Sequence, residues 1–188
     1  MTVGVALAAR TGLRLFTNHH TIDLALRFFD FGTPAFNRLV GEFRRRIIEE
    51  VARSELPGLI FTYVWAFDDP SDAAVVERYA DAFRSRGGSV FYVELQAAHA
   101  ERLRRNESAF RLAEKPHMRD LDASRRRLAE ADAAYQLDSR GMFDGRPDYL
   151  RIDTTELTAE QVADRIIARF GLPRIADATP TRDAHSSP

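Results

Sequence analysis

The stretch that decides the fold is Met1-Thr-Val-Gly-Val-Ala-Leu-Ala-Ala-Arg-Thr-Gly-Leu-Arg-Leu-Phe-Thr17. Val3, Leu7 and Ala8 recur at helical spacing, and Gly12 ends this helix because glycine adopts the left-handed conformation without steric cost. Residues 13–17 then alternate apolar and polar side chains, which is typical of a short strand. The sequence therefore predicts a helix, a tight turn, a strand and then a polar loop at residues 18–20.

Composition bounds the class of protein. The chain has 188 residues, of which 45% are hydrophobic, and this is enough to build the core of one domain. A net charge of -1 argues against a nucleic-acid partner, and the absence of cysteine excludes disulfides and cysteine-ligated zinc. We find no secretory signal and no apolar run of about 18 residues, so we expect a cytoplasmic protein with no membrane partner.

The rest of the sequence alternates helices and strands. An apolar helix follows the polar loop, and Thr33-Pro34 starts a long amphipathic helix that we expect to end at Pro57-Gly58. Residues 59–65 form a near-continuous apolar run, typical of a strand buried on both faces. The pattern predicts further helices at 72–86, 100–106, 122–137 and 159–170, and further strands at 90–95 and 149–153. This alternation indicates an α/β fold with a parallel, doubly wound sheet.

The first residues resemble P-loop small-molecule kinases such as shikimate kinase, gluconate kinase and chloramphenicol phosphotransferase. In that family the first strand runs into G-x-x-x-x-G-K-[ST], and the next helix ends in T-G-[LIV]. Residues 1–4 and 6–13 resemble the part just after the P-loop lysine, with Thr2 one position beyond the usual metal-binding Ser/Thr. The resemblance implies a three-layer P-loop NTPase-like parallel sheet with helices on both faces, and ATP and Mg²⁺ as cofactors.

The resemblance also implies a first strand and a phosphate loop, which this sequence does not contain. That strand would lie in the middle of the sheet, and leaving it out exposes two strand edges whose unsatisfied backbone groups cost about 1–3 kcal/mol each. We therefore interpret Met1 as an internal methionine taken as the start, and residues 1–173 as an N-terminally incomplete kinase-like domain. The alternative is that Met1 is the true start and the helix belongs to another α/β fold. Residues 174–188 lose apolar periodicity, so we expect a disordered tail.

A second resemblance concerns the nucleotide. In these kinases the fourth strand leads into a helix reading L-x-x-R-L-x-x-R, followed by a basic lid over the phosphates, and a D-T-[ST] strand end lies near the adenine. The segment 108–119 is the implied lid here, although a basic stretch is more often an ordinary solvated loop. The residues implied to bind the nucleotide are Thr2, Arg102, Arg105, Arg111, Lys115, Arg119, Asp153 and Thr154.

The residues implied to bind the substrate that accepts the phosphoryl group begin just after the strand at 13–17. In this family an aspartate just after the second strand orients or deprotonates the acceptor, and that position falls on or beside His19, with Asp23 one turn further on. Histidine suits this role because its ordinary pKa is about 6.5. We therefore take His19 and Asp23 as catalytic candidates; the alternative is that His19 is a hydrogen-bonded core histidine and its neighbours cap the next helix. The implied substrate-binding residues are Asn18, His20, Arg27, Tyr63 and Trp65.

Asp68 is the candidate magnesium ligand, because an acidic residue at the end of this strand often holds the metal in P-loop enzymes. The alternative is that Asp69-Pro-Ser71 only caps the next helix. We interpret Arg44-Arg-Arg46 as a solvated helix face.

Together these features predict an ATP-dependent phosphotransferase that acts on a small hydroxylated acceptor, as a monomer or homodimer, and that is inactive or impaired without its phosphate loop. Two alternatives stay open. Residues 153–166 are similar to the D-x-x-x-L-[ST]-x-x-x-V-A-x-x-I ending of tunicamycin-resistance proteins, which would indicate a nucleotide- or drug-binding role. The other alternative is a non-catalytic interaction module, which dimerisation without a response to Mg-ATP would favour.

Overall fold

The computed structural model describes residues 1–106 and 121–175. Helices and strands alternate along most of this part of the chain, as the sequence predicted. In order, the elements are α1 (Thr2–Thr11), β1 (Arg14–Thr17), α2 (Asn18–Ala25), α3 (Pro34–Arg53), β2 (Leu59–Thr62), α4 (Pro70–Arg84), β3 (Tyr92–Gln96), α5 (His99–Asn106), α7 (Leu121–Ala134), β4 (Tyr149–Asp153) and α8 (Ala159–Phe170).

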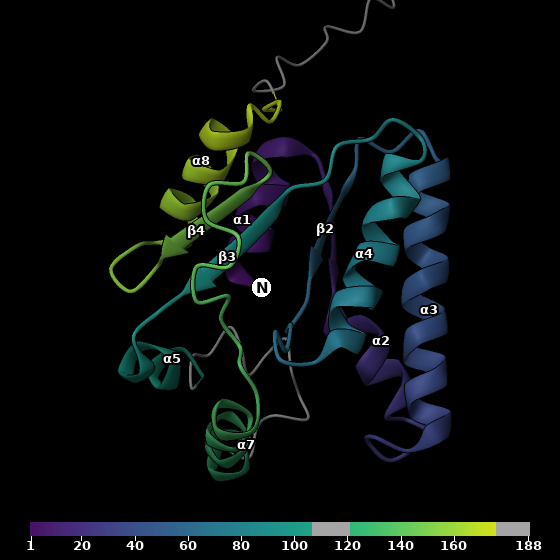
Figure 1. The fold of residues 1–188 in the computed structure, drawn as a ribbon, viewed down its shortest axis with the longest axis vertical. Coiled ribbons are helices and arrows are strands. Elements are labelled where there is room, and N and C mark those ends of the chain that lie inside the picture. The colour runs from purple at the N-terminus through teal and green to yellow at the C-terminus, as the bar shows by residue number, and fades with distance from the viewer. Residues whose placement is uncertain (107–120, 176–188) are drawn as a thin grey trace, which may run out of the picture.

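The strands form two parallel pairs (Figure 1). β1 pairs with β2, which sets Phe16 beside Phe61, and β3 pairs with β4, which sets Leu95 beside Ile152. Within the described residues neither pair has a third strand, so β2 and β3 each keep one edge without a strand neighbour. The chain is thus a mixed α/β protein with small parallel sheets.

Helices pack on both faces of the β1–β2 pair. α1 lies close on one face, since a Cβ atom added at Gly4 would be 2.7 Å from Leu15 Cδ1 and 3.8 Å from Ile60 Cγ2. Phe61 follows Ile60 and therefore points to the opposite face. There its ring makes a T-shaped contact with Tyr79 of α4, at a centroid distance of 5.6 Å.

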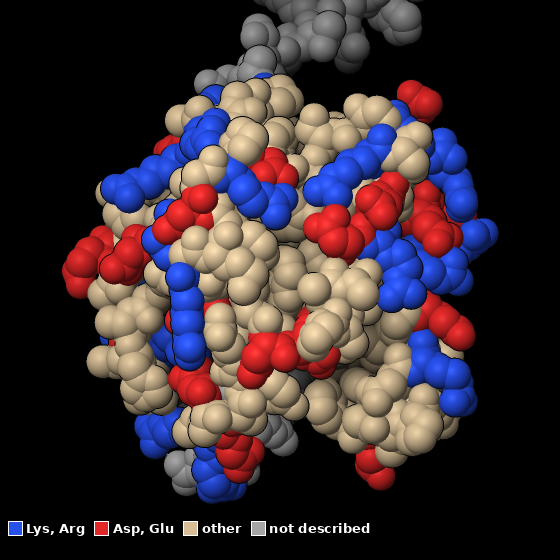
Figure 2. All heavy atoms as spheres, viewed as in Figure 1, with Lys and Arg blue, Asp and Glu red and all other residues tan. Residues whose placement is uncertain are grey.

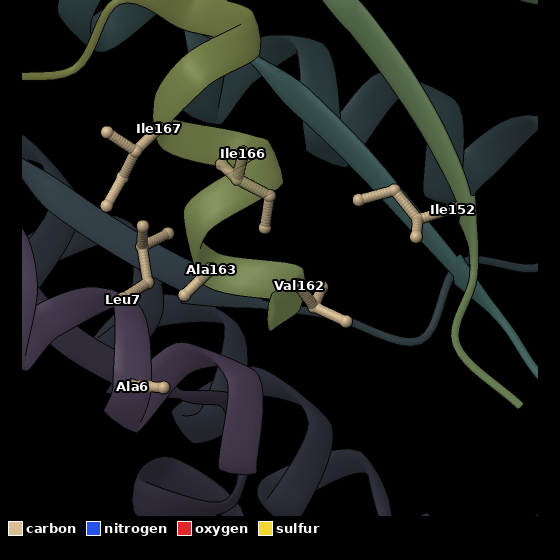
Figure 3. Packing of buried hydrophobic residues seen from close by; sticks show 7 residues of the cluster. All are labelled: Ala6, Leu7, Ile152, Val162, Ala163, Ile166 and Ile167. Carbon is tan, nitrogen blue, oxygen red and sulfur yellow. The ribbon is translucent and has the colours of Figure 1, made fainter. Parts of the chain in front are cut away.

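The main core joins the two pairs through helices. Ala6 and Leu7 of α1 pack against α8, whose Val162 and Ala163 are fully buried (Figure 3). Ile152 of β4 belongs to the same cluster, and Ile60 and Val93 of the two inner strands pack against it from the side. This cluster is the place where both halves of the protein meet.

Local sequence signals predicted several boundaries correctly. Gly12 ends α1 with φ 73°, in the left-handed conformation. Thr33 caps α3, with Pro34 in its first turn, and Asp69 caps α4 by accepting a hydrogen bond from the Ser71 N–H at 2.8 Å. Thr158 and Gln161 form the capping box of α8.

Other expectations need correction. The polar loop expected at residues 18–20 is the first turn of α2, which Thr17 precedes in an extended conformation. Strand β2 ends at Thr62 rather than at Trp65, and α3 ends at Arg53, before the Pro57-Gly58 pair. The predicted tail at 174–188 does not begin at its first residues. Arg174 pairs with Asp164 at 2.8 Å, and the Ile175 N–H donates to the Arg10 carbonyl at 2.8 Å, while residues 176–188 lie outside the described part.

The α1–α8 cluster predicts where the fold is sensitive to truncation. Val162→Ala removes buried apolar atoms and leaves a cavity, so we expect it to lower the free energy of unfolding by about 2 kcal/mol. Val5→Ala is the matched control, because Val5 on α1 is 44% exposed, and we expect it to cost less than about 0.5 kcal/mol. Urea denaturation of both variants measures the difference, and equal losses would contradict this assignment of the core.

Candidate functional site

A cavity of about 1370 Å³ lies between the two strand pairs, and its lining extends from the amino ends of the strands to their carboxyl ends. Ligands of open parallel sheets bind at the carboxyl ends of the strands. The cavity brings together residues that the sequence assigned to three different roles: acceptor binding, catalysis and nucleotide binding. The predicted site residues that line it are Asn18, His19, Tyr63, Trp65, Arg102 and Asp153.

Other predicted site residues lie away from the cavity wall. Thr2 is exposed on the first turn of α1, and Arg27 is exposed beyond the end of α2, so it does not share a helical face with Asp23. The described candidates outside the lining are Thr2, His20, Asp23, Arg27, Asp68, Arg105 and Thr154. The three lid candidates Arg111, Lys115 and Arg119 lie outside the described residues.

Arg44 of α3 anchors the wall that carries His19. Its guanidinium donates to the Thr21 hydroxyl at 3.1 Å and to the Asn18 carbonyl at 3.2 Å, which fixes the first turn of α2. The interpretation of residues 44–46 as a solvated face is therefore wrong for Arg44, although Arg45 and Arg46 do pair with acidic residues on the surface. The sequence did indicate this position of Arg44, because Arg44 lies four residues after buried Val40 and four before buried Ile48. It therefore shares the buried face of α3.

Tyr63 continues this wall from the end of β2. Its hydroxyl donates to Asp72 Oδ1 at 2.6 Å, and the Ala66 N–H donates to the other oxygen of the same carboxylate at 2.8 Å. The Arg44 guanidinium lies over the Tyr63 ring, 5.8 Å from its centroid. Burial, followed by the hydrogen bond to Asp72, raises the pKa of Tyr63, so the phenol remains a donor. The sequence pattern did not identify Asp72 as a contact of Tyr63, because it indicates only that Asp72 lies near the start of a helix.

Three aromatic rings form the next part of the lining. Trp65 stacks on Phe67 with a centroid distance of 4.7 Å, and Phe143 approaches both rings, at 5.6 Å and 5.8 Å. The indole Nε1 of Trp65 is buried and has no hydrogen-bond partner among the described residues. This side of the cavity thus offers a flat apolar surface, and the unpaired indole N–H is buried within the wall.

Glu94 is the centre of a polar cluster on the opposite strand. It accepts hydrogen bonds from the Tyr149 hydroxyl at 2.6 Å, the Gln96 amide at 2.8 Å and the Ser139 N–H at 3.2 Å. Burial acts to raise the pKa of Glu94, but these hydrogen bonds outweigh it and lower the pKa below the ordinary value. Burial and the bond to Glu94 raise the pKa of Tyr149 to about 12. The cluster keeps a carboxylate ionised within the cavity lining.

Arg105 acts on the turn that follows β4. It donates to the Thr154 hydroxyl at 2.9 Å and to the Thr154 carbonyl at 2.6 Å, and its Nε donates to Glu101 at 2.6 Å. Hydrogen bonds from Arg104 and then from Arg105 lower the pKa of Glu101 to about 2. Arg105 therefore holds the strand end in place from behind, rather than facing the cavity.

Arg102 lines the cavity and is held by α7. Its guanidinium makes a bidentate contact with Asp132, at 2.7 Å and 2.9 Å. The ion pair with Asp132 orients the Arg102 guanidinium. Because a guanidinium carries five N–H donors, some of them remain able to bind another anion.

The described residues do not form a metal site of their own. No group of three His, Cys, Asp or Glu side chains is placed to hold a metal ion in the described part of the chain. Asp68 Oδ1 accepts a hydrogen bond from the Gln136 N–H at 3.0 Å, which ties it to the loop before β4. Asp68 therefore makes a structural contact through one carboxylate oxygen, and its role as a magnesium ligand stays a prediction.

The fold and site define an α/β protein with a large cavity between its two pairs of parallel strands. No family model and no curated protein matches this chain. Among solved structures, the tunicamycin resistance protein of Deinococcus radiodurans is similar, with a TM-score of 0.52 and 21% sequence identity over 94% of this chain and 93% of that chain. At this identity the likeness shows a shared fold. Within the described residues, none of the helices has the length and apolar character needed to cross a membrane.

The Arg44 anchor gives a prediction about stability. Arg44→Ala removes a half-buried donor and leaves the Asn18 carbonyl and the Thr21 hydroxyl without it, so we expect a loss of about 1–3 kcal/mol in the free energy of unfolding. Arg45→Ala, one residue along the same helix, removes only an exposed ion pair with Glu49 and should cost about 0.5 kcal/mol or less. Chemical denaturation distinguishes the two variants, and equal costs would count against the anchor.

The Glu94 cluster predicts a dependence of stability on pH. Because folding lowers the pKa of Glu94, its contribution is present above the ordinary glutamate pKa of about 4.3 and is lost as the pH falls through the folded value. The stability difference between wild type and Glu94→Gln should therefore be constant above about pH 5 and shrink below about pH 4. Urea melts across this range measure it, with exposed Glu42→Gln as the control. A difference that does not change with pH would contradict the proposed hydrogen bonding.

Proposed function

We propose that this chain is an ATP-dependent phosphotransferase that acts on a small hydroxylated acceptor. The observation that carries the proposal is the convergence of His19, Tyr63, Trp65, Arg102 and Asp153 on one cavity at the carboxyl ends of the strands. These residues come from segments far apart in the sequence. The resemblance to P-loop kinases implied that these residues belong to one active site.

The acceptor would bind on the side of β1 and β2. His19 lines the cavity in the first turn of α2, where Arg44 fixes the backbone, and it would take the proton of the acceptor hydroxyl. The side chains of Asn18, Tyr63 and Trp65 would hold the acceptor, with the stacked rings as an apolar surface. His20 and Asp23 lie outside the lining, so we give them no direct contact.

The nucleotide would bind on the side of β3 and β4. Arg102 would approach it with the donors that Asp132 leaves free, and Asp153 would lie beside the base. Arg105 and Thr154 would act as positioning residues, because the Arg105 side chain holds the turn at Thr154 through its hydroxyl and its carbonyl.

Phosphoryl transfer also needs phosphates held by backbone N–H groups, a lysine and a metal ion. The sequence contains no G-x-x-x-x-G-K-[ST] segment, and the described acidic residues form no metal cluster. Bound Mg²⁺ would neutralise phosphate charge, but we derive no step through it. We therefore expect the 188-residue chain to recognise the nucleoside part of ATP and to bind the triphosphate weakly.

A second candidate function is drug binding in a resistance role. The likeness to the D. radiodurans tunicamycin resistance protein extends over 94% of this chain, and the aromatic wall of Trp65, Phe67 and Phe143 suits an organic ligand. Under this proposal tunicamycin itself would occupy the cavity.

Ligand-observed NMR with adenosine and Mg-ATP, together with thermal melts in tunicamycin, tests both candidates. The phosphotransferase proposal predicts saturation transfer to adenosine, at least about fivefold weaker in Arg105→Ala, because a lost charged hydrogen bond is worth about 1.5–3 kcal/mol. Arg104→Ala should keep the signal, because the guanidinium of Arg104 donates to Glu101 and not to the turn at Thr154.

The outcomes separate the two functions. Transfer to adenosine without a thermal shift from tunicamycin supports the phosphotransferase, and the reverse supports drug binding. His19→Ala should leave adenosine binding unchanged, because His19 lies on the acceptor side. Absence of any response to either ligand would overturn both candidates.

A further inference from the structure

A second cavity lies between α3 and α4, away from the space between the strand pairs. Its volume is about 280 Å³, close to the lower end of the roughly 300–1,000 Å³ that is typical of small-molecule pockets. The two helices run side by side in Figure 1, and both contribute to the lining. None of the described residues that the sequence assigned to a site belongs to it. This cavity, the α3–α4 cleft, is therefore separate from the site of the proposed function.

Three arginines from the two helices line the α3–α4 cleft. Arg38 and Arg45 are seven residues apart on α3, so they lie on one face of that helix, and Arg78 comes from α4. Arg45 uses one nitrogen, Nη1, to donate to Glu49 at 2.8 Å. Among the described lining residues the only acid is Glu42. The lining therefore has an excess of positive charge.

Two of these arginines are not neutralised by a neighbour. In Figure 2 basic side chains, several of them beside acidic ones, gather over α3 and α4 at the right of the view. Arg46 of α3 is an example, because it pairs with Glu50 at 3.0 Å. In the part of the chain that the structure describes, neither Arg38 nor Arg78 forms an ion pair. Both guanidiniums therefore keep their donors for a ligand in the cleft.

Gly41 leaves the floor of the cleft without a side chain. It lies between Arg38 and Arg45 on the same face of α3. Glycine inside a helix is less stable than alanine, because it loses more conformational freedom on folding. Close packing does not require it here, since a Cβ atom added at Gly41 would have no neighbour within 4 Å. The bare backbone gives a ligand room to meet the arginines on both sides of it.

Tyr79 forms the wall between the cleft and the main cavity, because it belongs to the lining of both. Its ring meets Phe61 of β2 edge-on, with a centroid distance of 5.6 Å. Burial raises the pKa of Tyr79, and the charges of Arg44 and Arg78 act in the opposite direction without cancelling this effect. The phenol therefore stays uncharged at neutral pH, and it does not repel an anion in the cleft.

The chemistry of the lining selects one kind of ligand. A guanidinium presents a planar fork of N–H donors that matches the oxygens of phosphate, and such bonds are stronger than those between neutral groups. A phosphate group has several terminal oxygens and a charge near −2 at neutral pH, so arginines on two helices can bind it at the same time. We propose that the α3–α4 cleft binds a phosphate group, free or carried by a small molecule, through Arg38, Arg45 and Arg78.

The test is a titration of the 188-residue chain with inorganic phosphate, followed by NMR at an ionic strength held constant with chloride. Saturable shifts are expected at the amides of Asn37, Gly41 and Val75. Arg38→Gln and Arg78→Gln should each raise the dissociation constant at least about fivefold, because each removes hydrogen bonds from a charged donor. Both variants should fold, since neither side chain forms an ion pair in the described residues.

Arg46→Gln is the matched control for charge. It removes the same charge from the same helix, but Arg46 is outside the lining, so the dissociation constant should change by less than about twofold. Glu42→Gln should have the opposite effect and tighten binding, because it removes the acid from the cleft. Equal weakening in Arg46→Gln and Arg38→Gln would overturn the proposal, since it would show only a general attraction to the basic surface.

Gly41→Leu tests the cleft without a change of charge. Leucine is a strong helix former, so the spectrum should report an intact fold, while its side chain fills the floor and should abolish saturable binding. Binding like that of wild type in this variant would overturn the cleft as the site.

Glycerol phosphate, used as a second probe, identifies the source of the phosphate group. Tighter binding than that of inorganic phosphate supports a small molecule as the carrier, and equal binding supports the free ion. No saturable shift with either probe at millimolar concentration would overturn the proposal. None of the substituted residues lines the main cavity, so the outcome is independent of the phosphotransferase proposal.

Discussion

The packing of α1 against α8 is the contact on which the rest of the structure depends. The two strand pairs share no strand in the described residues, so their relative position is fixed by Ala6 and Leu7 meeting Val162 and Ala163. Small side chains on both helices let the backbones approach closely. The cavity between the pairs exists because these helices hold the strand edges apart at a constant separation while leaving the space between them open.

Each half of the protein also has a polar network of its own. Arg44, Tyr63 and Asp72 connect α2, α3, β2 and α4 on one side, and Glu94 with Tyr149 connects β3 and β4 on the other. Each network satisfies the polar groups of its own half. The cavity lies between the two networks, and its lining includes both Tyr63 and Glu94.

Sequence patterns predicted the elements with strong local signals and missed contacts that arise between elements. The strand at 149–153 and the helix at 159–170 were predicted with their observed bounds, because a capping box and a left-handed glycine mark the helix. The resemblance to P-loop kinases implied site roles for His19, Tyr63 and Asp153, and all three line the cavity. The roles of Arg44, Asp72 and Glu94 could not be predicted, since each depends on a partner 9 to 55 residues away whose position only the folded chain determines. The contact between Asp68 and Gln136 could not be predicted for the same reason, because Gln136 comes from the loop before β4.

The carboxylate of Asp72 has a mechanical consequence. One of its oxygens accepts from the side chain of Tyr63 and the other from the backbone of Ala66, so the first turn of α4 is fastened to the chain on both sides of Trp65. The link between β2 and α4 is therefore a closed loop and not a free hinge. A shift of the backbone at Trp65 therefore has to move the first turn of α4 with it or break these bonds.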